Sequence, residues 1–280
     1  MKPKLVRTVA ALRRETAKWR AEGLRYAVVP TMGAIHSGHT QLVTEGLKRA
    51  DRVITTIFVN PKQFAAHEDL GKYPRDEDGD VRKLGKAGTH LIFSPAPDEI
   101  YPPGFSTTIS LAGPAKAGLE DKFRPLFFDG VATVVAKLFT QTGADIAMFG
   151  EKDYQQLQVV TRMAKDLDIA IEVIGVPTVR ETDGLAKSSR NRLPVENRAP
   201  AGRGHLPQPA ECRRTDPLRR QSSICHPFRD PHADHAGLQG RLRHCPQRRN
   251  SEHSTDQGEP LRLIAAAWLG KTRLIDNIAV

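Results

Sequence analysis

The sequence predicts an α/β fold whose N-terminal domain is a Rossmann-like, doubly wound parallel sheet. Short runs of β-branched residues alternate with amphipathic stretches from residue 1 to about 193. A helical stretch over 37–49 joins two such runs, 26–29 and 52–59, and the right-handed crossover of a strand–helix–strand unit favours parallel pairing. The alternation stops after residue 195, which predicts a degenerate or disordered C-terminal region.

The other elements of the predicted domain, residues 1–184, follow in chain order. A mostly apolar set of residues at helical spacing predicts a helix over 5–22; the set is Leu5, Val9, Leu12, Thr16 and Trp19. Further strands are expected at 90–93, 146–149 and 171–176. Further helices are expected at 76–87, 131–140 and 154–167. The domain therefore reads as repeated strand–helix units around one sheet.

Composition narrows the functional classes. Hydrophobic residues make up 39% of the 280 residues, enough to fill a core, and no run approaches the roughly 18 apolar residues of a membrane span. We therefore expect a cytoplasmic protein with no membrane partner. Three cysteines, none in a CxxC pair, predict neither a disulfide framework nor a zinc site.

The C-terminal region, residues 185–280, has a different amino-acid composition. The stretch 203–249 holds ten arginines, no lysine and all three cysteines, and repeated prolines interrupt 207–246. Dense proline and few aliphatic residues predict disorder over 200–260. In the last part, 261–280, we expect a helix-like apolar run that stops at Gly270 and a short strand over 273–278.

The strongest chemical signal is PTMGAIHSGHTQLV, residues 30–43, between a predicted strand and a predicted helix. His36 and His39 would project side by side where the helix begins, and Gly33 and Gly38 would let the backbone approach a bulky ligand. Free backbone N–H groups and the positive end of the helix dipole attract phosphate. The alternative is a plain strand-to-helix turn with two incidental histidines.

Two weaker clusters follow the later strands. In FGEKDYQQL, residues 149–157, Lys152 could neutralise phosphate and Asp153 could accept from ribose hydroxyls. In PTVRETDGLAKSSRNR, residues 177–192, four phosphate donors stand together: Lys187, Ser188, Ser189 and Arg190. Taken singly, the first is more typical of a solvated helix start, and the second is equally typical of a polar surface loop.

Together these residues resemble the HxGH superfamily of nucleotidyl transferases, whose second signature is a KMSKS-like loop, here residues 185–199. Within it the chain resembles the pantothenate synthetase family. The match runs through PTMGAIHSGH, FVNPKQF, YPR, VATVVAKLF, FGEKDYQQL, VPTVRETDGLAKSSRNR and the terminal LGKTRLIDNI. It covers about residues 1–195 and the family-like terminal segment 261–280, and ordered motifs are far more specific than any one alone.

The resemblance implies an ATP-dependent ligase of pantothenate biosynthesis. D-pantoate and ATP would give pantoyl-adenylate and pyrophosphate, and the amine of β-alanine would then displace AMP. It implies a homodimer formed through the N-terminal domain, and Mg²⁺ that bridges the ATP phosphates mostly through water, with no direct protein ligand for the metal. Residues 1–184 would form the domain that binds ATP and pantoate.

The resemblance also implies residue roles. Catalytic roles fall to His39 as the proton donor and to His36, Lys152, Ser188 and Arg190. Gln63 would bind pantoate and β-alanine, and Gln156 pantoate, because amides donate and accept together. The ATP-binding set is Met32, Gly33, Ala34, Ile35, His36, Ser37, Gly38, His39, Gly150, Glu151, Lys152, Asp153, Val179, Lys187, Ser188, Ser189 and Arg190.

The chain departs from the family pattern in three places. Lys187 stands where the family has an apolar residue, and this lysine would add a phosphate contact or distort the loop. Leu126-Phe127 replaces Gly-His, and this change would weaken the pantoate end of the pocket. Residues 200–260 lack the pattern of the small α+β lid domain that the family has there, so a degenerate or disordered region would stand in its place. Reading residues 202–212 one base later permits an amphipathic helix, so we hypothesise compensating frameshifts, which sequencing the DNA tests. A chain without the lid would show little ligase activity.

Three alternatives remain open at this point. One is another HxGH enzyme, such as a dinucleotide-forming nucleotidyl transferase or an aminoacyl-tRNA synthetase fragment. Another is nucleic-acid binding by the arginine-rich tail, which lacks an aromatic stacking pattern beyond Phe228, so we expect no nucleic-acid partner. The third is a catalytically impaired relative that keeps the nucleotide-binding fold.

Overall fold

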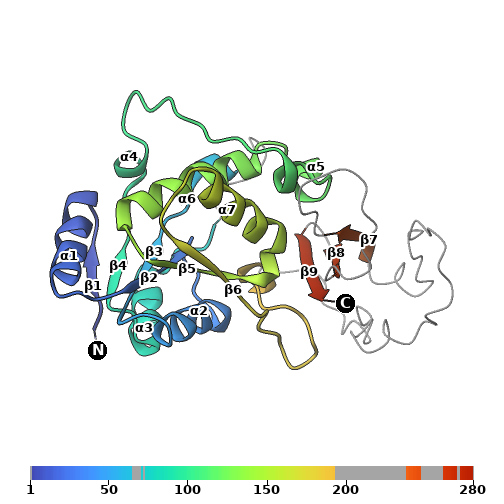
Figure 1. Ribbon diagram of the computed structural model, residues 1–280. Helices are drawn as coiled ribbons and strands as arrows, with labels where there is room; N and C mark the ends of the chain where they lie inside the picture. The colour runs from blue at the N-terminus through green and yellow to red at the C-terminus, as the bar shows by residue number, and fades with distance from the viewer. Residues whose placement is uncertain are drawn as a thin grey trace. The chain divides into compact units, whose positions relative to one another are not determined.

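The chain divides into two compact units, Met1–Val179 and Arg180–Val280. The computed structural model describes residues 2–64, 71, 73–192, 238–246, 261–269 and 272–279 (Figure 1). The division falls at Val179, close to the boundary predicted at 184. Each unit is described by itself below.

A parallel sheet forms the centre of the first unit. Its six strands lie in the order β1-β4-β3-β2-β5-β6, and every pairing is parallel. The strands are β1 (Lys4–Val6), β2 (Tyr26–Thr31), β3 (Arg52–Ile57), β4 (Leu91–Phe93), β5 (Ile146–Gly150) and β6 (Glu172–Val176). The predicted α/β fold with a parallel, doubly wound sheet is confirmed.

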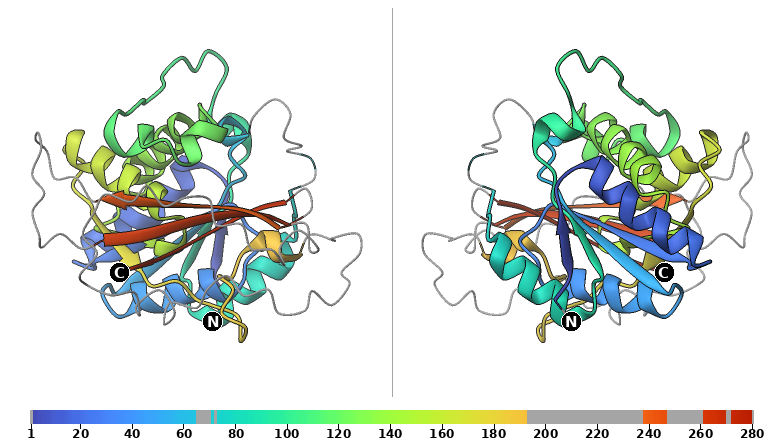
Figure 2. Two further views of the ribbon diagram at one scale, coloured as in Figure 1. Left: turned by 90° about the vertical axis from the view of Figure 1, so that its right-hand side faces the viewer. Right: turned by 90° about the vertical axis from the view of Figure 1, so that its left-hand side faces the viewer.

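Helices cover both faces of this sheet (Figure 1, Figure 2). Helices α2 and α3 pack together on one face, and α6 and α7 on the other, with α1 packed against α6. The helices are α1 (Val9–Ala21), α2 (Ser37–Leu47), α3 (Glu77–Ala87), α4 (Pro97–Ile100), α5 (Glu120–Phe123), α6 (Phe127–Thr142) and α7 (Tyr154–Asp166). Short 3-10 turns are η1 (Pro61–Gln63), η3 (Gly113–Lys116), η4 (Glu151–Asp153) and, in the second unit, η5 (Ser189–Arg192).

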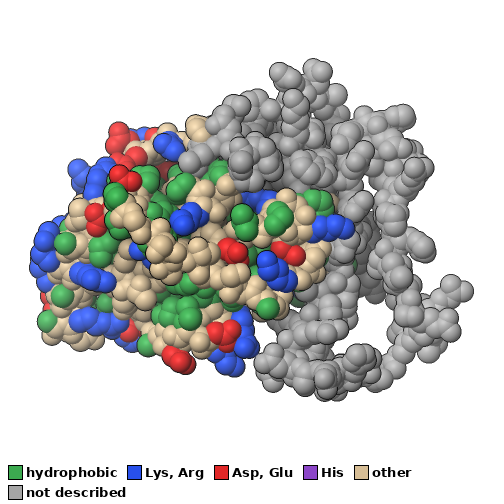
Figure 3. Space-filling model, turned by 90° about the horizontal axis from the view of Figure 1, so that it is seen from above, with side chains coloured by type: hydrophobic (Ala, Val, Ile, Leu, Met, Phe, Trp, Pro, Cys, Tyr) green, Lys and Arg blue, Asp and Glu red, His purple; other side chains and the backbone are tan. Residues whose placement is uncertain are grey.

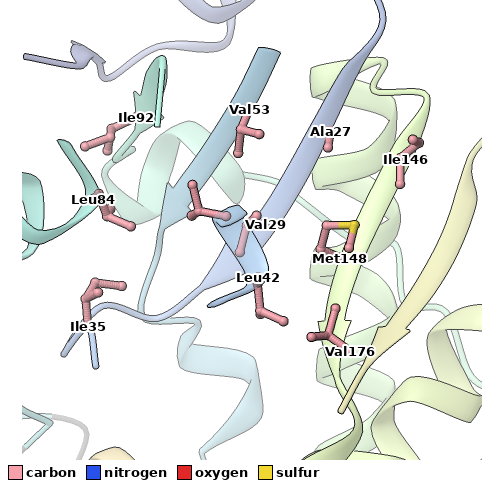
Figure 4. Packing of buried hydrophobic residues seen from close by; sticks show 11 residues of the cluster. Ala27, Val29, Ile35, Leu42, Val53, Leu84, Ile92, Ile146, Met148 and Val176 are labelled. Carbon is pink, nitrogen blue, oxygen red and sulfur yellow. The ribbon is translucent and has the colours of Figure 1, made fainter. Parts of the chain in front are cut away.

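The core lies between the sheet and its helices (Figure 4). Strand β2 is buried along most of its length, which is why it reads as a continuous apolar run instead of an alternating one. Its Val29 packs in one cluster with Leu42 of α2 and Met148 of β5. Ile35, in the loop after β2, is fully buried in the same cluster and so ties that loop to the core.

The helix predicted over 5–22 was wrong at its start. Residues Lys4–Val6 form β1, which pairs in parallel with β4, and the helix begins only at Val9, after Thr8. The hydroxyl of Thr8 caps this helix by accepting from the N–H of Ala11 at 3.2 Å. Helical spacing around Leu5 misled the prediction, because the partner strand lies far away in the sequence.

The second unit contains an antiparallel sheet in the order β7-β8-β9, with β7 (Leu238–Pro246), β8 (Leu261–Leu269) and β9 (Thr272–Ala279). Two predictions are corrected here. The helix-like run is strand β8, because β7 and β9 pair with its backbone on both sides and override its alanine-rich helical propensity. Disorder does not hold for Leu238–Pro246. The rest of 200–260 and the hypothesised frameshift lie outside the described residues.

Surface and helix length bear on possible partners. Within the described residues, every helix is too short or too polar to cross a bilayer. Basic and acidic side chains lie interspersed among apolar ones on the face of the described part shown in Figure 3.

Candidate active site

The candidate site lies at the carboxyl ends of the parallel strands of the first unit. Strand β2 pairs with β5, and the chain passes from β2 toward β3 on one side and from β5 toward β6 on the other. Open α/β sheets bind ligands at such a switch point. The first two predicted clusters follow β2 and β5 directly, so the fold brings them to the same edge.

The loop after β2, residues 32–36, has an unusual backbone. Gly33 and Ala34 both have positive φ, +84° and +51°. A Cβ on Gly33 would lie 3.1 Å from Oδ2 of Asp80, so this position needs glycine. Ala34 has a Cβ and adopts the left-handed conformation nonetheless, at a cost of about 1–2 kcal/mol. Contacts outside the loop must therefore hold it.

The two histidines begin helix α2. Nδ1 of His36 accepts from the backbone N–H of Gly38 at 3.1 Å, and Nδ1 of His39 accepts from the backbone N–H of His36 at 3.3 Å. The ring centroids lie 4.1 Å apart. Since each Nδ1 accepts, each neutral ring carries its proton on Nε2. The cap thus fixes both the orientation and the tautomer of the pair.

Burial lowers the pKa of His39 to about 3; the neighbouring His36, Lys152 and Lys83 lower it as well, whereas Asp153 raises it. His39 is therefore neutral at physiological pH. A neutral imidazole donates a hydrogen bond through Nε2, and the helix N-terminus around it favours an anion. The Coulombic effects of Lys152 and Asp153 also show that the second cluster lies near His39.

The turn η4, which joins β5 to α7, presents an ion pair. Nζ of Lys152 lies 3.1 Å from Oδ1 of Asp153, and the side chain of Lys152 is 19% exposed. Gly150 and Glu151 lead into this turn, and Gln156 lies in the first turn of α7, where its side chain is partly buried. A half-buried cation close to the histidine pair suits a phosphate ligand.

Gln63 lies in η1, after β3, and Asn60 holds its side chain. Nδ2 of the buried Asn60 donates to Oε1 of Gln63 at 2.9 Å and to the carbonyl of Gly130 at 3.1 Å, and Oδ1 accepts from the hydroxyl of Tyr101 at 2.8 Å. Burial raises the pKa of Tyr101, which therefore stays protonated and donating. Asn60 thus bridges η1, α6 and the residue after α4.

Helix α6 supports the same turn from the other side. A Cβ on Gly130 would lie 2.2 Å from the carbonyl oxygen of Lys62, so only glycine allows this close approach. Nη2 of Arg124 donates to the carbonyl of Gln63 at 2.6 Å. The Arg124 guanidinium also lies over the ring of Phe127, 3.9 Å from its centroid. These contacts make η1 a rigid platform for Gln63.

A family model described as Pantoate-beta-alanine ligase matches residues 4–279 of this chain. The chain belongs to the pantoate–beta-alanine ligase family. Its members are ligases that form a C–N bond, and this settles the choice between pantothenate synthetases and other HxGH enzymes.

Individual relatives agree with this assignment. The chain is 50% identical to the pantothenate synthetase of Caulobacter vibrioides, with 99% of each chain covered. It is 51% identical to that of Ruegeria pomeroyi, with 100% of this chain and 98% of the relative covered. The crystal structure of pantothenate synthetase from Thermus thermophilus has a TM-score of 0.75 at 35% identity over 98% of both chains.

A Francisella tularensis pantoate-beta-alanine ligase structure, complexed with beta-gamma ATP and beta-alanine, is also similar. It has a TM-score of 0.75 at 29% identity and covers 99% of this chain and 97% of its own. Relatives are thus matched along nearly their whole length.

The loop that carries the family's second signature lies in the second unit. Arg180 donates to Oδ2 of Asp276 at 2.6 Å and to Oδ1 at 3.1 Å, and also to the carbonyls of Gly184 and Asn277. Strand β9 therefore fixes the start of this loop. Nδ2 of Asn191 donates to the carbonyl of Ala186 at 3.1 Å, which closes a short loop over residues 186–191 that includes Ser188.

Two departures from the family pattern have structural consequences. Nζ of Lys187 lies 3.2 Å from Oε2 of Glu181, so this lysine pairs within its own loop. Leu126 is 73% exposed, whereas Phe127 lies beneath Arg124, which holds the Gln63 turn. Phe127 thus supports the platform of Gln63.

The structure places the predicted site residues in two groups. In the first unit, each predicted site residue follows a strand of the parallel sheet. The 32–39 segment follows β2, Gln63 follows β3, the η4 turn and Gln156 follow β5, and Val179 follows β6. All of them therefore belong to the carboxyl edge of the sheet. Lys187, Ser188 and Ser189 belong to the second unit. The side chain of Arg190 lies outside the described part.

Sequence reasoning missed the residues that hold the site together. Asn60 lies inside the quoted motif FVNPKQF without a role assigned to it, and Arg124 lies beside the noted Leu126-Phe127 departure. Asp80 gave no local signal, since it lies in an acidic helix start that reads as a solvated surface. Their partners are distant in the sequence, and only folding reveals them.

Proposed function

We propose that the first unit binds ATP and D-pantoate and forms pantoyl-adenylate, and that the chain then joins the acyl group to β-alanine. In the first step a carboxylate oxygen of pantoate attacks the α-phosphorus and pyrophosphate leaves. In the second, the β-alanine amine attacks the acyl carbon, loses a proton and releases AMP. The His36–His39 pair at the start of α2, in which His39 is neutral, carries this proposal together with the neighbouring Lys152–Asp153 turn.

The pair acts as fixed hydrogen-bond donors. Both Nδ1 atoms already accept backbone hydrogen bonds, so Nε2 donates to the phosphate oxygens, and His39 does so without becoming a cation. Donors preorganised toward charge that develops on the leaving pyrophosphate lower the barrier more than they strengthen ground-state binding. The positive end of the α2 dipole adds to the same effect.

The remaining residues bind and orient substrates. Lys152 neutralises phosphate as a point charge, and Gly150 and Asp153 bind the ribose. Gln63 binds pantoate and β-alanine, and Gln156 pantoate, because an amide can donate to a carboxylate and accept from a hydroxyl. The backbone of Val179 contacts adenine. The other ATP contacts come from Met32, Ser37, Ser188, Ser189 and Arg190. The buried Ala34 and Ile35 donate their backbone N–H groups to Asp80 instead, and Lys187 pairs with Glu181.

Mg²⁺ would be held by phosphate oxygens and water. Within the described residues, no group of three or more His, Cys, Asp or Glu side chains is arranged to hold a metal ion. A hard cation that keeps several waters suits a site of this kind. When bound, it would neutralise charge on the leaving pyrophosphate. The family resemblance further supports a homodimer formed through the first unit and a cytoplasmic location.

A ligase assay on the full-length chain tests the proposal. With ATP, D-pantoate, β-alanine and Mg²⁺, AMP release should require both pantoate and β-alanine. Without β-alanine, the chain should still catalyse pantoate-dependent exchange of pyrophosphate into ATP. A folded chain that shows neither reaction is instead the impaired relative that its unusual 200–260 segment suggests.

Replacing the histidine pair sharpens this test. The double variant His36→Ala, His39→Ala should lower the exchange rate by about 10³-fold or more, since loss of one preorganised donor costs about 10²–10³-fold. Asp78→Asn, an exposed change on α3, is the control. Normal exchange by the double variant would refute the assigned role of the pair.

A further inference from the structure

Asp80 is a buried carboxylate outside the residues assigned above. It lies in the first turn of α3, and only 2% of it is exposed. A buried carboxylate is costly unless hydrogen bonds satisfy its oxygens. Its partners therefore indicate why it is there.

Both oxygens of Asp80 accept hydrogen bonds from the loop after β2. Oδ2 accepts from the N–H of Ala34 and Oδ1 from the N–H of Ile35, each at 2.8 Å. Among the described residues, Nζ of Lys83 forms an ion pair with Asp80: it lies 3.6 Å from Oδ1 and comes from the same helix. The two short bonds span 46 and 45 residues, so Asp80 ties α3 directly to the loop that precedes the histidines.

The loop needs this support because of its backbone. Gly33 and Ala34 have positive φ, and the conformation of Ala34 is unfavourable for a residue with a Cβ. The carboxylate binds the two successive N–H groups that this conformation turns to the same side. The next residue is His36, the N-cap of α2, whose backbone N–H orients the ring of His39.

We propose that Asp80 is a positioning residue for the nucleotide: by holding Ala34 and Ile35, it sets where His36 and His39 present Nε2 to the ATP phosphates. The inference rests on the proposed function. A carboxylate is required because both of its oxygens accept. Asparagine offers one oxygen and one NH₂ group, and would place a donor against a backbone N–H.

The test replaces Asp80 by asparagine, with Asp78→Asn as the matched control. Asp78 lies on the same helix and is exposed, so it undergoes the same chemical change away from the loop. For Asp80→Asn, we expect kcat/KM for ATP to fall by about 100-fold, as for small misplacements of catalytic groups. The KM for β-alanine should stay unchanged, and far-UV circular dichroism should stay that of the folded chain.

A carboxylate that only stabilises the fold predicts another pattern. Activity would then fall in proportion to the folded fraction, and the KM for ATP would stay constant. That result, or normal kinetics in a folded Asp80→Asn chain, overturns the proposal.

Amide hydrogen exchange tests the contact even where the variant does not fold. In the wild-type chain the amides of Ala34 and Ile35 should exchange as slowly as those of β2. Exchange at the rate of an exposed loop overturns the proposal. The same measurements separate this proposal from the proposed function. If the wild-type chain shows no pantoate-dependent reaction, the ligase assignment is refuted. The role of Asp80 still holds in that case if both amides exchange slowly and Asp80→Asn weakens the binding of MgATP.

Discussion

The two loops that carry the predicted phosphate-binding residues are held in different ways. The loop over 32–36 is held by burial and by hydrogen bonds. Its Ile35 is fully buried in the core, and the buried Asp80 accepts hydrogen bonds from two backbone N–H groups of the loop. The loop after Arg180 is held by polar contacts to a terminal strand, in which Arg180 is 28% and Asp276 14% exposed. Burial fixes the first loop, and a partly solvated ion pair the second.

The difference in burial indicates which of the two loops is preorganised for phosphate binding. Interactions shielded from water are strong and insensitive to salt, whereas partly exposed charge pairs are weakened by screening. The first loop is therefore a rigid part of the fold. The second loop depends on β9, because Asp276 of this strand binds Arg180. The family-like end of the chain therefore holds the second loop, although residues 200–260 depart from the family pattern.

The largest effect should come from Gly33→Ala. The new Cβ would meet Oδ2 of Asp80 at 3.1 Å and force positive φ on an alanine, so we expect a loss of about 1–3 kcal/mol in the free energy of unfolding. Urea denaturation measures it. Gly104→Ala is the control, since Gly104 has φ +83° with no atom within 4 Å of its Cβ position. If both variants lose the same free energy of unfolding, the contact with Asp80 is not the cause of the loss.

An effect of similar size should come from the ion pair of the second loop. Arg180→Ala should cost about 1.5–3 kcal/mol, because it leaves Asp276 and two carbonyls without a charged donor. A double-mutant cycle with Asp276→Asn isolates the pair, and its coupling energy should shrink in high salt. A coupling energy near zero at low salt would contradict the role of β9.

Per pH unit, a smaller effect comes from the titration of His39. The pKa of His39 is lowered to about 3 in the folded chain from an ordinary value of 6.5, so the unfolded chain binds a proton that the folded chain does not. The stabilisation is therefore present above 6.5 and is lost as the pH falls toward 3, with a slope of up to about 1.4 kcal/mol per pH unit.

His39→Gln should flatten this slope, because glutamine keeps an N–H donor and does not titrate. His90, whose pKa burial also lowers, keeps its share in both chains. Urea denaturation at several pH values measures the slopes. Identical pH dependence in the two chains would show that His39 titrates normally.

The smallest effect should come from Lys187→Leu, which restores the family's apolar residue. The pair with Glu181 is partly exposed, at 28% and 43%, and such pairs contribute about 0–1 kcal/mol. Ligase activity should change by less than about threefold, the equivalent of well under 1 kcal/mol. A larger loss would mean that Lys187 contacts phosphate.

Sequence patterns predicted the first unit well and the second poorly. The six-residue strand β2 and helices α2, α3 and α7 were expected nearly where they lie, since their apolar periods are long and unambiguous. Strand β1 was missed because three residues carry no period and their pairing partner is β4. Strand β8 was taken for a helix because its Ala265–Ala267 run favours one until β7 and β9 pair with it.

The same division applies to the site. The sequence by itself determined the family, the parallel sheet and the histidine pair at a helix start, because these depend on local residue types in a fixed order. Only the tertiary structure decided that His39 is neutral, that Asn60 holds Gln63 and that Asp80 holds the loop. Burial and hydrogen bonds between distant residues arise when the chain folds, so no local pattern encodes them.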